Sequence, residues 1–186
     1  MNYAALFAAG LPYQQFLQQY GTDEHRRRWE SFHGQVKLAE AQQQLLKSFT
    51  RDMKVLVLAG VWCGDCVNQC PIFEHFASQT PRLQIRYLDR DANPEFAKEL
   101  SICGGARVPV VVFLTEDDML CGRAGDRTLS KYRHMAAGLE GTTCPTGLIP
   151  DPDHLNAAVV QDWLNEFERV QWMLRTSSRL RQKHGD

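Results

Sequence analysis

Residues 55–66 read Val-Leu-Val-Leu-Ala-Gly-Val-Trp-Cys-Gly-Asp-Cys. The first five form a continuous apolar run, with charge before it and Gly60 after it, which is typical of a strand buried on both faces. Helical patterning follows from Cys63 to Ser78. The stretch therefore predicts a central parallel strand that turns directly into a helix, with two cysteines in the first helical turn.

Strand and helix patterns alternate beyond this point. Leu83 to Leu88 reads as a second strand, and the polar turn of residues 89–94 leads into a short helix over residues 94–100. Val108 to Leu114 is the most β-prone run of the chain, and a shorter strand over residues 119–123 completes an antiparallel hairpin. This order predicts an α/β fold with helices on both faces of a sheet.

Further segments flank this core. Residues 12–49 have helical spacing and predict two or three helices, with breaks at Gly21-Thr22-Asp23 and His33-Gly34. Residues 138–153 hold several glycines and prolines and read as a connecting loop. A long helix follows from His154, with an apolar stripe made of Val160, Trp163, Phe167, Val170 and Leu174.

The remaining residues, 175–186, form a charged tail that we expect to fray. We expect one domain over residues 1–186. It comprises a helical N-terminal extension (1–50), a core (51–140), and a loop with a long C-terminal helix (141–186).

Composition narrows the functional classes. The 21 Lys and Arg residues balance the 22 Asp and Glu residues, which gives no electrostatic reason to expect nucleic acid or an anionic membrane as partner. The run Arg26-Arg27-Arg28 is typical of a solvated helix face. Residues 1–17 do not resemble a secretory signal, and no run approaches the roughly 18 apolar residues of a membrane span. Six cysteines without an export signal favour reduced thiols and a cytoplasmic location.

The two cysteines at the helix start predict redox chemistry. Their spacing brings the sulfurs close enough to form a disulfide, and the unpaired N–H groups of the first turn stabilise a thiolate. We expect Cys63, at the exposed end, to attack a substrate disulfide, and Cys66, one turn deeper, to resolve the mixed disulfide. The pKa of Cys63 is expected to lie below that of free cysteine.

These residues resemble the thioredoxin family, in the variant that carries Trp-Cys-Gly-Asp-Cys. The resemblance covers about residues 50 to 140 and includes the turn Asp91-Ala92-Asn93-Pro94 and the pair Val108-Pro109. It implies a three-layer α/β/α sandwich in which Pro109 is cis and lies beside the dithiol, where the preceding backbone pairs with the substrate chain.

The chain departs from the family at several positions. Val57 stands where thioredoxins keep a buried acid that assists the resolving thiol, and Tyr87 replaces the lysine that accompanies it. Ala59 replaces the first aromatic of the Trp-x-x-Trp-Cys pattern. The N-terminal helices and the long C-terminal helix lie outside the minimal fold.

Several other residues are candidates for substrate binding. Trp62 is expected to form part of the rim, next to Gly64 and Asp65, and Arg107 precedes Val108 and Pro109. The charge of Asp65 should oppose ionisation of the thiols and that of Arg107 should favour it. Charges about 8 Å apart interact by roughly 2 kcal/mol at an effective dielectric of 20, so we expect the two effects largely to offset.

Two alternatives stay open. Cys70 extends the pattern to Cys-x-x-Cys-x-x-x-Cys and could complete a metal site, although a zinc site needs a fourth ligand and His75 lies off that helix face. Alternatively, Cys70 is a buried apolar residue or a second resolving thiol. The other cysteines, Cys103, Cys121 and Cys144, are expected to be unpaired.

The sequence thus predicts a thiol:disulfide oxidoreductase that reduces disulfides of proteins or small thiol-containing substrates. It needs no bound cofactor or metal, and its electrons come from an unidentified reductase or low-molecular-weight thiol. The alternative function is a redox-sensing binding protein whose helical N-terminal region docks a partner.

Overall fold

The computed structural model of the chain describes residues 1–139 and 154–186. At its centre lies a mixed sheet with the strand order β2-β1-β3-β4. The strands are β1 (Met53–Ala59), β2 (Leu83–Asp89), β3 (Val110–Thr115) and β4 (Leu120–Gly125). β1 runs parallel to β2 and antiparallel to β3, so the predicted central strand has one parallel neighbour. β3 and β4 form the predicted antiparallel hairpin.

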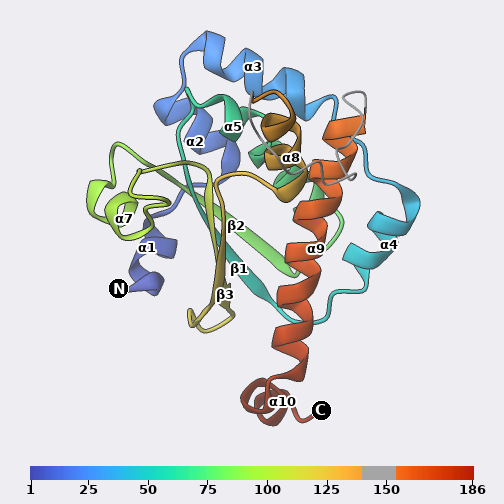
Figure 1. Ribbon diagram of the computed structural model, residues 1–186. Helices are drawn as coiled ribbons and strands as arrows, with labels where there is room; N and C mark the ends of the chain where they lie inside the picture. The colour runs from blue at the N-terminus through green and yellow to red at the C-terminus, as the bar shows by residue number, and fades with distance from the viewer. Residues whose placement is uncertain (140–153) are drawn as a thin grey trace.

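Helices cover both faces of this sheet. The described helices are α1 (Tyr3–Ala9), α2 (Tyr13–Tyr20), α3 (Asp23–His33), α4 (Glu40–Lys47), α5 (Gly64–Val67), α6 (Cys70–Ala77), α7 (Pro94–Glu99), α8 (Leu129–Ala137), α9 (Leu155–Thr176) and α10 (Ser178–His184). Figure 1 shows α1 and α7 on one side of the sheet and α9 on the other. The predicted three-layer α/β/α arrangement is confirmed.

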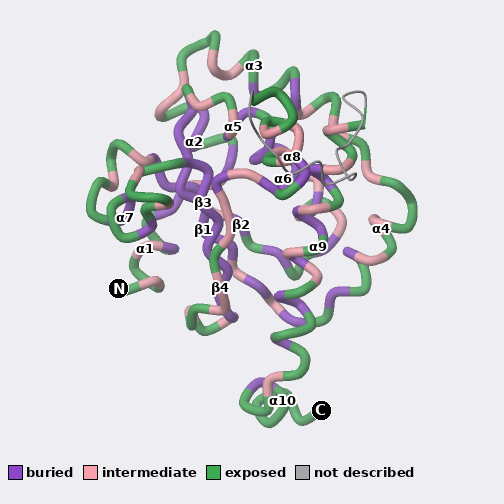
Figure 2. The backbone as a smooth tube through the Cα atoms, viewed as in Figure 1, coloured by how far each residue is buried: buried purple, intermediate pink, exposed green. Residues whose placement is uncertain are grey.

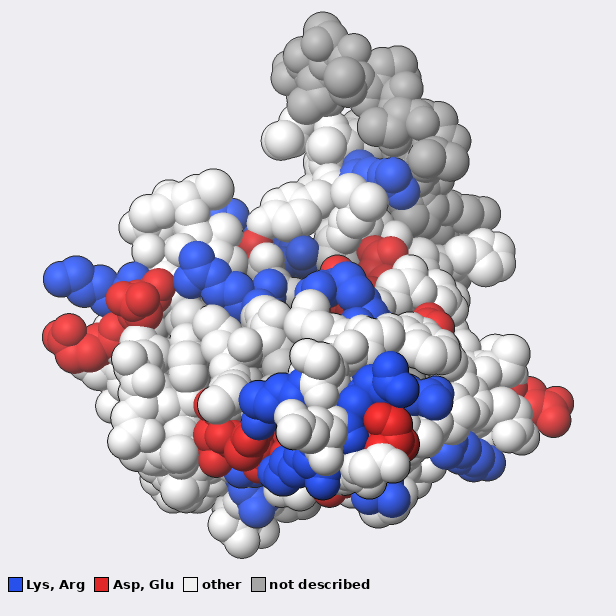
Figure 3. Space-filling model, turned by 90° about the horizontal axis from the view of Figure 1, so that it is seen from below, with Lys and Arg blue, Asp and Glu red and all other residues white. Residues whose placement is uncertain are grey.

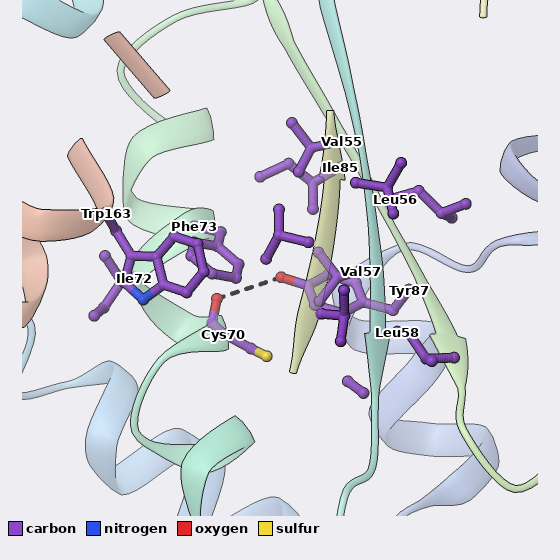
Figure 4. Close-up of a cluster of buried hydrophobic side chains, with 14 of the residues drawn as sticks. Val55, Leu56, Val57, Leu58, Cys70, Ile72, Phe73, Ile85, Tyr87 and Trp163 are labelled. Atoms are coloured by element: carbon purple, nitrogen blue, oxygen red, sulfur yellow. Dashed lines mark hydrogen bonds between the residues drawn. The ribbon is translucent and has the colours of Figure 1, made fainter. Parts of the chain in front are cut away.

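The apolar run of β1 lies at the centre of the core. Each residue from Val55 to Ala59 is at most 1% exposed, as expected for a strand covered on both faces (Figure 2). Val57 lies on the side of α6 and α9, with Phe73 and Trp163 nearby, whereas Leu56 points to the opposite side (Figure 4). The apolar stripe of α9 seals the first side, because the Phe167 ring packs edge-on against Phe76 and Phe113, with ring centroids 5.2 Å apart in each case.

The N-terminal helices are part of this core. Leu11, between α1 and α2, exchanges two backbone hydrogen bonds with Tyr87 on the outer edge of β2 and so protects that edge. Phe16 and Trp29 are completely buried. The predicted helix breaks at Gly21 and Gly34 are confirmed, whereas α1 was not predicted. Residues 1–50 are therefore an integral layer of the fold.

The C-terminal tail is ordered, so the expectation that residues 175–186 fray is wrong. α10 buries Leu180, which is 1% exposed. Its charged side chains pair with the β3–β4 turn, Arg179 with Asp117 and Lys183 with Glu116. Figure 3, which looks at the molecule from this end, shows basic and acidic side chains gathered together. The charges of the tail hold the helix in place.

The predicted connecting loop and the predicted absence of a membrane span concern the two ends of the described ranges and the helices in general. The predicted connecting loop of residues 138–153 lies, apart from its first two residues, outside the described part of the chain. Among the described helices, none is both long enough and apolar enough to cross a membrane.

Candidate redox site

The cysteine motif follows β1 as predicted, but the helix after it is interrupted. A single helix was expected over residues 63–78, whereas the structure has a single turn, α5, and then α6, separated at Asn68 and Gln69. Pro71 explains the break, because proline has no N–H group to bond the carbonyl of Val67. Cys63 is the N-cap residue of α5.

The two thiols differ in exposure in the way that the predicted roles require. Both are reduced; Cys63 is partly exposed and Cys66 is completely buried. The Cys63 Sγ donates a hydrogen bond to the Val108 carbonyl oxygen at 3.5 Å, and the Cys66 Sγ accepts one from the Gly60 N–H at 3.5 Å. Only Cys63 can meet a substrate directly.

The expected low pKa of Cys63 is wrong for this reduced state. The contact with the Cys66 thiol and partial burial raise the pKa of Cys63 above its ordinary value, although the N–H groups of Cys66 and Asp65 act in the opposite direction. Burial raises the pKa of Cys66; the Cys63 thiol opposes this rise and Cys70 adds to it. A helix of one turn has only a small dipole, so it cannot offset desolvation.

Trp62 lies on the rim of a cavity of about 380 Å³ beside Cys63. Its indole is 40% exposed and packs against the backbone of Gly60, where an added Cβ would lie 2.7 Å from the ring. The Arg90 guanidinium stacks on the ring at 4.3 Å from a centroid. Arg90 fixes the orientation of Trp62, and the sequence analysis did not identify it.

Asp65 and Arg107 line the same cavity, but each has a partner of its own. The Asp65 carboxylate pairs with Arg127 at 2.6 Å and with Lys131 at 2.7 Å. Arg107 approaches the buried carboxylate of Asp126 at 3.4 Å. The expected opposition between Asp65 and Arg107 is therefore replaced by one ion-pair network, in which Arg127 bridges Asp65 and Asp126.

Asp126 is the buried anion of this region. Burial raises the pKa of its carboxyl, but a hydrogen bond from Tyr132 and the charges of Arg127 and Arg107 outweigh it, so the net pKa is lowered. Asp126, Arg127 and Tyr132 come from the segment after β4, some 60 residues from the cysteines in the sequence, and Arg107 precedes β3. No local pattern in the chain indicates that they meet.

The Val108–Pro109 bond is cis, as the resemblance implies, and the Val108 carbonyl faces Cys63. Gly125 packs against this segment with φ +138°, and a Cβ there would lie 2.3 Å from the Pro109 oxygen. A side chain at this position would therefore push Pro109 away from the dithiol.

Two buried side chains tie the cysteine loop to the rest of the fold. Gln69 donates hydrogen bonds to the carbonyl oxygens of Asp65 and Asp126 and accepts one from the Trp163 indole. The Trp29 indole of α3 donates to the Val61 carbonyl oxygen at 2.8 Å. Sequence reasoning missed both, since their partners are distant in the chain.

The position of the family's buried acid holds Val57, which is fully buried among apolar side chains. The nearby carboxyl of Glu74 belongs to α6 and accepts a hydrogen bond from the Tyr87 hydroxyl at 2.8 Å. Burial raises the pKa of Glu74, and the bond from Tyr87 opposes this rise. Tyr87 also contacts the Cys70 carbonyl oxygen at 3.3 Å (Figure 4).

The other cysteines differ in burial, and none of the described ones forms a disulfide. Cys70 is fully buried behind Cys66, as expected for an apolar residue, and Cys103 and Cys121 are unpaired. Cys144 lies outside the described residues. Within residues 1–139 and 154–186, no group of three or more His, Cys, Asp or Glu side chains could hold a metal ion. The alternative of a metal site at Cys63, Cys66 and Cys70 thus gains no support.

Comparison with models of known families identifies the family to which the sequence belongs. A family model described as thioredoxin matches residues 10–129. The chain belongs to the thioredoxin family. The match begins within the N-terminal helices, so it extends beyond the region of the sequence resemblance. Among curated proteins, none matches the chain.

Solved structures extend the likeness over almost the whole fold. A Pseudomonas aeruginosa protein of unknown function is 18% identical with a TM-score of 0.70, and the match covers 91% of this chain and 96% of that one. An HIV epitope scaffold is 17% identical with a TM-score of 0.68, covering 91% of this chain and 97% of that one. Both show that the thioredoxin fold with these flanking helices recurs; neither indicates an activity.

Proposed function

We propose that this thioredoxin-family chain is a cytoplasmic thiol:disulfide oxidoreductase that reduces disulfides through Cys63 and Cys66. One observation carries the proposal: a partly exposed thiol faces the Val108 carbonyl beside Pro109, and a buried thiol lies one turn behind it. An attacking thiol must meet the substrate, whereas a resolving thiol must reach only the first sulfur.

The reaction proceeds in two exchanges. The Cys63 thiolate attacks one sulfur of the substrate disulfide, the substrate S–S bond breaks, and the leaving thiolate takes up a proton. Cys66 then loses its proton and attacks the Cys63 sulfur, which releases the second substrate thiol and leaves a Cys63–Cys66 disulfide. Two electrons pass to the substrate, and a dithiol reductase or a low-molecular-weight thiol must return them.

The raised pKa values of both thiols favour the reducing direction. A dithiol whose thiolates gain little stabilisation has no special preference for the reduced form, so its disulfide is not a strong oxidant. The proposed role is therefore that of a reductase, with disulfides of proteins or small thiols as substrates.

Catalytic reduction of insulin by dithiothreitol tests the proposal. The unmodified chain should turn over many times, Cys63→Ser should be inactive, and Cys66→Ser should accumulate a mixed disulfide with insulin. Cys121→Ser is the matched control, because it removes a thiol far from the site and should retain full turnover. Equal activity of Cys63→Ser and the unmodified chain would contradict the proposal.

A second candidate is a redox-responsive binding protein. The hydrogen bond from Trp29 to the Val61 carbonyl favours it, because this bond links α3 directly to the loop before Trp62. Such a protein would oxidise once per molecule and change its affinity for a partner. Absence of insulin turnover, together with a stable Cys63–Cys66 disulfide, would favour this function over the enzyme.

A further inference from the structure

The cavity beside Cys63 buries its acids and exposes one of its cations, Arg107. Asp65 and Asp126 line it, but their side chains are only 16% and 3% exposed and are already paired with basic partners. The Arg107 side chain, by contrast, is 44% exposed. A ligand that approaches Cys63 therefore meets positive charge first.

Arg107 has hydrogen-bond donors to spare. Within the described residues, its only side-chain hydrogen bond is the long one of 3.4 Å to Asp126, whose carboxylate also receives Arg127 and Tyr132. A guanidinium has five N–H donors in a planar fork that fits a carboxylate. Since Arg107 directly precedes Val108, a carboxylate bound there would lie next to the sulfur under attack.

Arg90 supports this arrangement. Its guanidinium lies over the Trp62 ring, pairs with the exposed Asp91 at 2.7 Å, and reaches the Ala106 carbonyl oxygen at 3.4 Å. These contacts join the loop that carries Arg107 to the Trp62 rim. Arg90 is thus a positioning residue, and Arg107 is the group free to bind.

A second exposed cation lies beside Gly64, the residue that follows Cys63. The Nη2 atom of Arg28, in α3, is 4.0 Å from the point where a Cβ on Gly64 would lie. Arg28 is exposed and forms no hydrogen bond or ion pair with any residue that the structure describes. The neighbouring Trp29 is anchored to the Val61 carbonyl, which fixes this part of α3 beside the dithiol.

We propose that Cys63 selects disulfides in acidic peptide segments, with Arg107 and Arg28 binding carboxylates on the two sides of the substrate half-cystine. The proposal rests on the oxidoreductase function and names its substrate class. Exposed ion pairs each contribute about threefold in rate or affinity, so two together should give roughly a tenfold preference.

A single-turnover assay tests the preference without the second thiol. In the Cys66→Ser variant, the Cys63 thiolate attacks the cysteine sulfur of a peptide 2-thiopyridyl disulfide, the S–S bond breaks, and thiopyridine leaves as the reporter. The peptides are Gly-Asp-Cys-Asp-Gly and the same sequence with Asn in place of each Asp. Each rate is divided by the rate at which mercaptoethanol attacks the same peptide disulfide. The acidic peptide should react about tenfold faster at low salt, and the ratio should shrink at about 0.5 M salt.

Substitution of each arginine tests which residues produce the preference for the acidic peptide. Arg107→Gln and Arg28→Gln should each lower the ratio about threefold, because each removes one exposed ion pair. Arg82→Gln is the matched control: it removes the same charge at the other end of β2 from Arg90 and should leave the ratio unchanged.

The outcomes separate this proposal from the one on which it rests. Equal rates for the two peptides would overturn the acidic preference even if insulin is turned over. So would a ratio of the two rates that stays the same in both Arg107→Gln and Arg28→Gln. Failure of Cys63 to attack either peptide would overturn both proposals.

Discussion

Replacement of Gln69 by leucine tests how the cysteine loop is held in place. The buried Gln69 amide makes three hydrogen bonds: to the Asp65 and Asp126 carbonyl oxygens at 3.1 and 3.0 Å, and from the Trp163 indole at 3.0 Å. Leucine fills the space but leaves all three partners unsatisfied. At about 1 kcal/mol for each bond, the variant should lose about 3 kcal/mol of unfolding free energy. With an m-value of about 2 kcal/mol/M, the urea midpoint should fall by about 1.5 M.

Gln171→Leu is the control for this experiment. Gln171 is also buried and bonds the backbone N–H groups of Thr50 and Arg51 and the Arg51 carbonyl, away from the dithiol. Both variants should lose similar stability, but only Gln69→Leu should change the rate at which folded protein reacts through Cys63. A loss below about 1 kcal/mol for Gln69→Leu, or equal changes in Cys63 reactivity for both variants, would refute the reasoning.

Three further predictions follow from individual contacts. Gly125→Ala should lower the free energy of unfolding by about 3 kcal/mol, since its Cβ would lie 2.3 Å from the Pro109 oxygen. Urea unfolding should show no such loss for Gly138→Ala, where the nearest atom among the described residues, the Met135 oxygen, lies 3.6 Å from the Cβ. Leu180→Ala should lower the free energy of unfolding by about 2–3 kcal/mol in the same assay. A loss near zero would mean that α10 does not pack against the core through Leu180. Because the pKa values of both thiols are raised, the reduction potential should fall by about 59 mV per pH unit between pH 6 and 8, and a slope near half that would reveal one thiolate.

The raised thiol pKa values also predict how stability depends on pH. An unfolded cysteine ionises at a lower pH than Cys66 does in the fold, so above about pH 8.5 the unfolded state binds fewer protons than the folded state. Unfolding free energy should therefore fall as pH rises through that range. Cys66→Ser should weaken this dependence, and an unchanged slope in that variant would contradict the assignment.

The sequence was sufficient to predict the core because its signals are local. The apolar runs of β1 and β3 and the turn between β3 and β4 each specify their element within a few residues, and the cysteine motif marks the end of β1. The interruption between α5 and α6 could also have been predicted, since Pro71 cannot continue a helix through Val67.

Other features depend on tertiary contacts that no local pattern encodes. The partners of Asp65 are Arg127 and Lys131, after β4, and Trp29 reaches the Val61 carbonyl from α3. The pKa of Cys63 was wrongly predicted because the contact with the Cys66 thiol and burial raise it, and both emerge only when the chain folds. The tail was wrongly expected to fray, because its charged composition does not reveal that these charges pair with a turn some 60 residues earlier.

The N-terminal helices change how the alternative function should be tested. Phe16 and Trp29 are fully buried, so deletion of residues 1–33 would open the core rather than remove a docking module. Arg28→Gln alters the exposed surface of α3 and leaves the buried side chains in place. Partner binding should therefore be compared in this variant.

Equilibration of the chain in glutathione and dithiothreitol redox buffers, followed by acid trapping and peptide mapping, is the most direct test of the redox assignment. We expect a single Cys63–Cys66 disulfide with a reducing potential, roughly −270 mV, and its complete loss in Cys63→Ser. No disulfide at any redox poise, or a Cys66–Cys70 disulfide in its place, would contradict this assignment.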